Sequence, residues 1–118
     1  MNIDYYGHPR CTTSKAAEKE LKSLGIDMRF IDLTQEAPSP SQLESWMEEG
    51  DWPVKAFFNT SGIKYRELGL KDKVPTMTVA EAAQLLATDG MLIKRPLLVR
   101  DGTLLQIGYR TPYADLKL

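Results

Sequence analysis

The amino-acid sequence predicts an α/β fold in which two strand-containing halves flank an all-helical segment. The first residues follow a β-α-β pattern, residues from about 35 to 90 carry only helix and loop signals, and an Asp-Gly pair near the end joins two short apolar runs. A β-α-β unit places two parallel strands in one sheet with the helix as a right-handed crossover. The chain has 118 residues, the commonest size of one domain, so we expect residues 1–118 to form a single domain.

The first half is predicted to contain a strand at residues 3–6 and a helix from about residue 11 to residue 24. Apolar residues recur in the second segment at the spacing of one helical face, while lysines occupy the other face. These apolar residues are Ala17, Leu21 and Leu24. Gly25 follows where a left-handed C-terminal cap is favoured.

The second strand of this half is expected within residues 26–33, where the side chains alternate along the chain. Ile26, Met28 and Phe30 fall on one side of the strand, and this side is predicted to face the core. The strand-to-helix loop then lies at the edge of the sheet where α/β proteins bind their ligands.

Residues from about 35 to 90 are expected to form a helical insertion between the two halves. Residues 39–42 are a capping box with proline at the first helical position, and residues 78–81 are another. Asp51 is predicted to cap a helix between these two, and Gly90 is predicted to end the last helix.

The last part of the chain is predicted to be a β-hairpin followed by a short helix. Asp101 and Gly102 join two apolar runs, and this pair suits a type I′ turn because both central positions need a positive φ. Pro112 is placed to begin the final helix.

Composition and charge limit the classes of partner. Fifteen Lys and Arg residues against sixteen Asp and Glu give a net charge of −1, which provides no general attraction to nucleic acid or to an anionic membrane. No apolar run approaches the roughly 18 residues of a membrane span, and the first residues lack the order of a signal peptide. We therefore expect a cytoplasmic protein with no direct nucleic acid or membrane partner.

The only cysteine, Cys11, stands where the first helix is predicted to begin. Unpaired N–H groups and the helix dipole favour a thiolate at this place, and such settings lower a cysteine pKa from ~8.5 to about 3.5–7.5. Arg10 adds a cation, and the hydroxyls of Thr12, Thr13 and Ser14 can donate to the sulfur or to a bound oxyanion. The sequence therefore predicts a reactive thiol.

Two other interpretations of this loop remain open at this point. Cys11 could be a small buried apolar residue, as most free cysteines are. His8, the only histidine, could be a general base, could position the loop, or could simply be exposed. One cysteine and one histidine leave a zinc site or a Cys-His-Asn constellation without enough ligands or partners, so no metal site is expected.

Ser14 stands where a C-x-x-C protein has its second cysteine. Without that second thiol, the protein cannot close an internal disulfide and must pass a mixed disulfide to an external thiol. This spacing predicts a monothiol mechanism.

The chain resembles the arsenate reductase/Spx family of thioredoxin-like proteins over nearly its whole length. The segments that carry the resemblance are "YYGHPRCTTSKAAEKELKSLGI", "FFNTSGIKYRELGLKD", "LIKRPLLVRDG" and "QIGYR". The resemblance implies a thioredoxin-like fold. In that fold, a mixed four-stranded sheet has its β-α-β and β-hairpin-α halves separated by a helical insertion.

The resemblance also implies roles for individual residues. Cys11 corresponds to the nucleophile and Arg95 to a catalytic, anion-binding arginine, while Pro96 corresponds to the cis-proline that faces the cysteine. The glutathione-coupled arsenate reductases carry an arginine where this chain has Asn59, and a neutral amide cannot provide the same forked cationic grip. The residues expected to bind the substrate or its anionic group are Arg10, Thr12, Thr13, Ser14, Asn59, Pro96 and Arg110.

Three functions follow as hypotheses. The first is a monothiol reductase in which Cys11 acts on an oxyanion or a mixed disulfide, with glutathione as co-substrate, glutaredoxin or thioredoxin as partner, and no bound cofactor. The second is an Spx-like regulator that binds the RNA polymerase α subunit through a surface including Arg95 and the region of Gly50, without a disulfide switch. The third is a redox-inactive binding protein that could use the aromatic residues of segment 45–58, although their spacing favours the insertion's own core.

Overall fold

The structure is a computed structural model that describes residues 2–118. The chain forms two compact units. The first consists of the residues up to Asp32 together with Arg95–Leu118, and the second consists of Leu33–Lys94. The predicted insertion at about 35–90 falls within the second unit. Within residues 2–118, no helix has the length and apolar character that crossing a bilayer requires.

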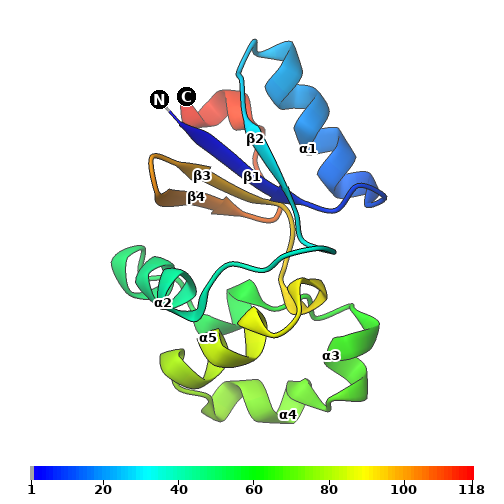
Figure 1. Cartoon of the computed structure of the whole chain (residues 1–118), viewed down its shortest axis with the longest axis vertical. Coiled ribbons are helices and arrows are strands. Elements are labelled where there is room, and N and C mark those ends of the chain that lie inside the picture. Colours follow the sequence, from blue (N-terminus) through cyan, green and yellow to red (C-terminus); the bar gives the residue numbers. More distant parts are fainter. Residues whose placement is uncertain (1) are drawn as a thin grey trace. The chain divides into compact units, whose positions relative to one another are not determined.

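The first unit is built around a mixed four-stranded sheet in the order β2-β1-β3-β4 (Figure 1). The strands are β1 (Ile3–Gly7), β2 (Arg29–Asp32), β3 (Leu97–Arg100) and β4 (Thr103–Ile107). Strand β1 runs parallel to β2 and antiparallel to β3, and β3 runs antiparallel to β4. The predicted β-α-β unit and β-hairpin are both confirmed.

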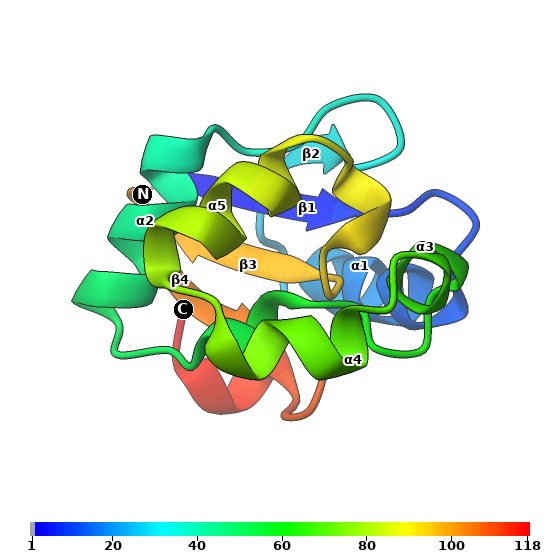
Figure 2. The ribbon, with the colours of Figure 1, turned by 90° about the horizontal axis from the view of Figure 1, so that it is seen from below.

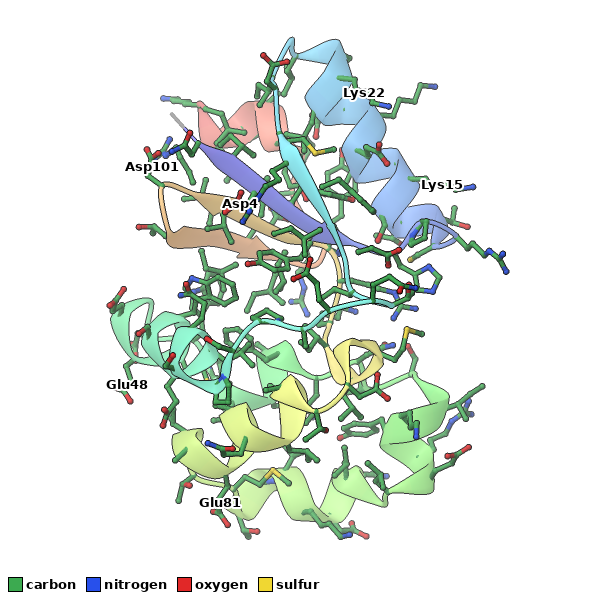
Figure 3. The ribbon with its side chains drawn as sticks, in the orientation of Figure 1. Asp4, Lys15, Lys22, Glu48, Glu81 and Asp101 are labelled. Carbon is green, nitrogen blue, oxygen red and sulfur yellow. The ribbon has the colours of Figure 1, made fainter. Side chains whose placement is uncertain are left out.

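Two helical elements cover one face of this sheet. They are α1 (Thr12–Ser23) and the single 3-10 turn η4 (Tyr113–Leu116). They share one core with β1 and β3, whose buried members are Ile3, Tyr5, Ala17, Leu21, Leu98 and Tyr113. Lys15 and Lys22 extend away from α1 on its outer side (Figure 3), so this helix is amphipathic as the sequence predicts.

The turns of the first unit follow the predicted chemistry. Cys11 is the N-cap of α1 and Leu24 is its C-cap, and Gly25 follows with φ of 71°. In the hairpin, Asp101 has φ of 49° and Gly102 has φ of 84°. Both central residues therefore have the positive φ of a type I′ turn.

Phe30 is less buried than the sequence predicts, although it lies on the predicted side of β2. This side chain is 37% exposed, whereas Ile31, on the other side of the strand, is only 7% exposed. Ile26 and Met28 do pack against the core, but they precede the paired strand, which begins at Arg29. Phe30 pairs with Tyr5 and packs against its ring, so it lies on the face of the sheet that carries the core. Because β2 is an edge strand, part of the Phe30 ring stays exposed.

The second unit contains only helices apart from one isolated bridge between Phe58 and Ile93. Helices α2 (Pro40–Glu49) and α5 (Val79–Ala87) pack side by side, as Figure 2 shows. The shorter elements are η1 (Val54–Phe57), α3 (Ile63–Glu67), α4 (Leu70–Lys73), η2 (Val74–Thr76) and η3 (Gly90–Leu92). Three aromatic residues of segment 45–58 are buried in this unit, which favours a core role over a docking surface; they are Trp46, Phe57 and Phe58.

Capping explains where α2 and α5 begin. The Ser39 hydroxyl accepts a hydrogen bond from the Gln42 N–H at 3.2 Å. Before α5, the Thr78 hydroxyl accepts from the Glu81 N–H at 3.1 Å, and the Glu81 carboxylate accepts from the Thr78 N–H at 2.9 Å. Both predicted capping boxes therefore mark a helix start, and the second is complete.

Two predicted helix boundaries need correction. Asp51 does not cap η1, because that turn begins after Pro53 and Asp51 itself has φ of 52°. Gly90 does not end α5, which stops at Ala87; instead, Gly90 begins η3, where an added Cβ would lie 2.0 Å from the Leu33 carbonyl oxygen. Glycine is required at position 90 because another part of the backbone approaches it closely, and not because a helix ends there.

The Glu20 carboxylate on α1 holds the C-terminal segment through three hydrogen bonds. Glu20 Oε1 accepts hydrogen bonds from the Tyr109 hydroxyl and the Tyr113 N–H, both at 2.6 Å, and Oε2 accepts from the Ala114 N–H at 3.2 Å. Partial burial raises the pKa of the Glu20 carboxyl, but these three hydrogen bonds outweigh it and keep the pKa below its ordinary value. Glu20 thus caps η4 from another element.

We predict that Glu20→Ala lowers the free energy of unfolding at neutral pH by roughly 1–2 kcal/mol, the usual loss when a helix cap is removed. Because the folded-state pKa lies below the unfolded one, ionised Glu20 stabilises the fold above the unfolded pKa of about 4.3. This contribution disappears as the pH falls through the folded-state pKa. Urea denaturation at several pH values measures it.

Glu18→Ala is the matched control, because Glu18 is on the same helix and pairs only with the exposed Lys22 at 3.4 Å. Its loss is expected to be a few tenths of a kcal/mol. Equal destabilisation by the two variants would contradict the capping role of Glu20.

Candidate functional site

Cys11 lies at the N-terminus of α1. Its backbone is extended, with φ of −83° and ψ of 126°, and its carbonyl accepts the first helical hydrogen bond from the Lys15 N–H at 2.9 Å. The Cys11 N–H donates to the His8 carbonyl at 3.2 Å, which folds the loop back on itself. The side chain is partly exposed. Cys11 is therefore not a sealed core residue, and its sulfur is adjacent to the free N–H groups of the first helical turn.

The surroundings of Cys11 stabilise its thiolate. Burial raises the pKa of the thiol, but hydrogen bonds from the Ser14 N–H, the Arg95 side chain, the Ser14 hydroxyl and the Thr13 N–H outweigh it and lower the pKa to about 7. Thiol and thiolate are then present in comparable amounts at neutral pH. A thiolate in this range combines availability with nucleophilicity, because the optimum attacking thiol has a pKa near the ambient pH.

Ser14 contributes to this environment through both its backbone and its side chain. The residue is 1% exposed, and its hydroxyl oxygen accepts a hydrogen bond from the His8 N–H at 3.2 Å. Since a hydroxyl has one hydrogen to donate, this arrangement leaves the hydrogen of Ser14 for the Cys11 sulfur. Ser14 therefore acts as a donor at the position where a dithiol protein would have a second sulfur.

The topology of the sheet brings Arg95 to the edge at which β1 ends and the loop to Cys11 begins. Strands β1 and β3 are antiparallel with Tyr6 opposite Leu97, so the end of β1 and the start of β3 lie at the same edge. Two nitrogens of the Arg95 guanidinium, Nε and Nη1, are shielded from solvent and have no hydrogen-bond partner among residues 2–118. Shielded cationic donors without partners are unfavourable, and an anionic group bound beside Cys11 would supply the missing acceptors.

The Arg95–Pro96 peptide bond is cis, as the resemblance implies. The Pro96 carbonyl accepts a hydrogen bond from the Gly108 N–H at 2.8 Å, which joins the start of β3 to the end of β4. Pro96 is buried. Its expected contact with a ligand stays a prediction.

The other candidates in the first unit are more peripheral. Arg10 is exposed and its N–H donates to His8 Nδ1 at 2.9 Å, while Thr12 is exposed and Thr13 affects Cys11 through its N–H. Arg110 is exposed, and its N–H donates to the Gln106 side chain at 2.8 Å. The Arg110 guanidinium makes no hydrogen bond or ion pair with any residue that the structure describes.

Asn59 belongs to the second unit, between η1 and α3. Its N–H donates to the Leu92 carbonyl at 2.8 Å, and its side-chain oxygen accepts from the Ser61 hydroxyl at 3.3 Å. An added Cβ at Gly62 would lie 2.9 Å from its side-chain nitrogen. The local contacts of Asn59 thus organise a loop, and its expected role in substrate binding stays a prediction.

Sequence analysis did not single out Tyr5. Its hydroxyl donates a hydrogen bond to the Ser14 carbonyl, so a residue of β1 supports the first turn of α1 beside the thiol. A tyrosine in a short apolar strand gives no sign of this role, because its ring alone explains its burial.

The described residues contain no cluster of three or more histidine, cysteine, aspartate or glutamate side chains suited to a metal ion. The candidate site consists of the Cys11 thiol, the donors of the first helical turn and the Arg95 guanidinium.

The strand order β2-β1-β3-β4 and the single cysteine at the start of α1 are those of a thioredoxin-like protein. Comparison with protein families identifies the family within this class. Residues 6–112 match the ArsC family, and the chain belongs to this family.

Three similar proteins show the range of the family. The chain is 42% identical to the uncharacterised protein YusI of Bacillus subtilis, with 93% of this chain and 92% of YusI covered. It is 29% identical to the regulatory protein MgsR of the same organism, with 100% of this chain and 90% of MgsR covered. The chain is 49% identical to a possible arsenate reductase from Streptococcus mutans, and the match covers 98% of each chain. The crystal structure of that protein superimposes on this structure with a TM-score of 0.96.

We predict that Arg95→Met raises the Cys11 pKa by roughly one unit, the usual effect of removing a nearby opposite charge. Arg100→Met changes the net charge equally, but Arg100 lies opposite Ile3, at the end of β1 away from Cys11, so we expect a shift of only a few tenths of a unit. The ultraviolet absorbance of the thiolate as a function of pH measures both values. Equal shifts in the two variants would mean that Arg95 acts only through net charge.

Proposed function

We propose that the protein is a monothiol reductase in which Cys11 attacks an oxyanion or a mixed disulfide and Arg95 holds the anionic group of the substrate. The observation that carries this proposal is the pairing of a thiol whose pKa is about 7 with two shielded, unpartnered guanidinium nitrogens. Membership of the ArsC family and the similarity to a possible arsenate reductase support the same chemistry.

With a mixed disulfide as substrate, the Cys11 thiolate attacks one sulfur of the S–S bond. A new disulfide forms between Cys11 and that sulfur, and the other half of the substrate leaves as a thiolate. The N–H groups at the start of α1 and the Arg95 guanidinium stabilise the negative charge on the attacking sulfur before the reaction. Arg95 also favours substrates with a carboxylate or another anionic group close to the disulfide.

With an oxyanion such as arsenate, the Cys11 sulfur bonds to the central atom and one oxygen leaves as water after accepting a proton. A glutathione thiolate then attacks the Cys11 sulfur. The electron pair of the bond between sulfur and the central atom stays with that atom, which is reduced by two electrons, and Cys11 is left in a disulfide with glutathione.

Both routes end with Cys11 in a mixed disulfide that the protein cannot resolve by itself, because Ser14 has no thiol. An external thiolate, from glutathione or from glutaredoxin, attacks the disulfide and releases the Cys11 thiolate. Glutathione is therefore the proposed co-substrate.

Glutathione-dependent turnover tests this function. We predict that the wild-type protein reduces arsenate, a glutathionylated peptide, or both, when glutathione and glutaredoxin are supplied, and that Cys11→Ser abolishes turnover because a hydroxyl is a far weaker nucleophile at neutral pH. The consumption of reducing equivalents is measured for each substrate separately, so the assay also identifies the substrate class.

Thermal denaturation of Cys11→Ser provides the control, since the variant should unfold within a few degrees of the wild type. Arg100→Met, at the end of β3 that lies opposite Ile3 and away from Cys11, should retain most of the wild-type turnover, whereas Arg95→Met should lose turnover and bind the substrate less tightly. Undiminished turnover in Cys11→Ser, or no wild-type turnover with either substrate, would contradict the proposed function.

The similarity to MgsR over the whole chain favours a second candidate function, a regulator without a disulfide switch that binds the RNA polymerase α subunit. If this function is correct, purified α subunit will be retained by the wild-type protein and equally by Cys11→Ser, because the thiol is not part of the docking contact. Absence of binding to purified α subunit would eliminate this candidate, while leaving the reductase proposal unaffected.

A further inference from the structure

We propose that the Tyr5 hydroxyl is a positioning group: by binding the carbonyl oxygen of Ser14 it fixes this residue in the position from which its N–H and hydroxyl stabilise the Cys11 thiolate. Tyr5 does not touch the thiol itself and is not among the residues expected to bind substrate. The inference rests on the proposed role of Cys11 as nucleophile, and it adds a residue of β1 to that site.

The contacts form a short chain from the sheet to the sulfur. The Tyr5 hydroxyl donates to the carbonyl oxygen of Ser14. The N–H of the same residue, together with its hydroxyl, donates to the Cys11 sulfur, and the Ser14 N–H is the largest stabilising contribution to the thiolate. A change in the orientation of Ser14 would therefore alter two of the four hydrogen bonds that favour ionised Cys11.

The Tyr5 ring is held in place by its neighbours on β1 and β2. An added Cβ at Gly7 would lie 2.7 Å from Tyr5 Cε1, so the ring occupies the space that a side chain at position 7 would fill. The Phe30 ring packs against it with a centroid distance of 5.8 Å and an interplanar angle of 31°. Tyr5 itself is 0% exposed. A hydroxyl on a ring fixed in this way has a defined position relative to α1.

Tyr5 acts as a donor throughout the range in which Cys11 titrates. Burial raises the pKa of Tyr5 far above its ordinary value, although the Ser14 side-chain hydroxyl opposes this effect, and Glu18, Cys11 and Tyr109 raise the pKa further. Tyr5 therefore remains protonated near neutral pH. Its hydroxyl serves as a fixed hydrogen-bond donor and takes no part in proton transfer.

Tyr113 shows that burial of a tyrosine in this core does not by itself require such a bond. It is 0% exposed in the same core cluster, yet its hydroxyl oxygen has no hydrogen-bond partner among residues 2–118. The two tyrosines thus make a matched pair. One hydroxyl is connected to the thiol through Ser14, and the other is not.

The test compares Tyr5→Phe with Tyr113→Phe, each of which removes one hydroxyl and keeps the ring. We expect Tyr5→Phe to raise the Cys11 pKa by roughly half a unit, the scale of one hydrogen bond lost at a neighbouring group. The thiolate fraction below neutral pH then falls roughly threefold, which slows alkylation under the same conditions. Tyr113→Phe should leave the pKa and the alkylation rate unchanged.

Three controls separate positioning from general loss of stability. Thermal denaturation confirms that each variant is folded where the thiolate is titrated. Incorporation of para-aminophenylalanine at position 5 restores a donor to the Ser14 carbonyl and should return the pKa toward the wild-type value. Titration of wild-type Cys11 gives the reference.

An unchanged Cys11 pKa in folded Tyr5→Phe, an equal shift in Tyr113→Phe, or no recovery with para-aminophenylalanine would overturn the positioning role. These results leave the reductase proposal intact as long as wild-type Cys11 titrates near pH 7. A wild-type pKa at the ordinary value of about 8.5 would instead remove the basis of both proposals.

Discussion

The candidate site depends on one constraint, which is that the first turn of an α-helix has N–H groups without partners in the helix. In α1 these groups meet a sulfur in place of the oxygen of a usual N-cap side chain, and the cap residue Cys11 makes no side-chain cap hydrogen bond of the ordinary kind. The N–H groups of Thr13 and Ser14 instead stabilise the Cys11 thiolate. The same contacts therefore satisfy the first turn of the helix and favour ionisation of the Cys11 thiol.

The sheet determines what else can reach this helix start. Because β3 is antiparallel to β1, the residues that precede β3 lie at the edge where β1 ends, and Arg95 is one of these residues. The β-α-β unit thus presents the thiol and the hairpin unit presents the guanidinium, even though more than 80 positions separate Cys11 from Arg95 in the sequence. The side chain of Tyr5, on β1 between β2 and β3, is in turn placed beneath the first turn of α1.

Sequence analysis succeeded where local chemistry decides the structure. The type I′ turn at Asp101 and Gly102, the capping boxes and the left-handed Gly25 each depend on a few neighbouring residues, and the structure confirms them. The partial exposure of Phe30 was not predictable in the same way, because it depends on the position of β2 at the edge of the sheet. The environment of Cys11 was predictable from its place at a helix start, whereas the connection through Tyr5 depends on a contact between a strand and a helix that no local pattern encodes.

The side chain at position 14 has an oxygen where a C-x-x-C protein has a sulfur, and this one atom distinguishes monothiol from dithiol chemistry. A second cysteine there would lie at the same helix start and could form an intramolecular disulfide, which would release the substrate without help. The Ser14 hydroxyl is buried, accepts from the His8 N–H and stabilises the Cys11 thiolate, so it makes the first attack easier while leaving the mixed disulfide without an internal partner. In the proposed reductase, formation of the adduct would therefore be controlled by donors within the protein, and its breakdown by whichever thiol can approach Cys11 from solution.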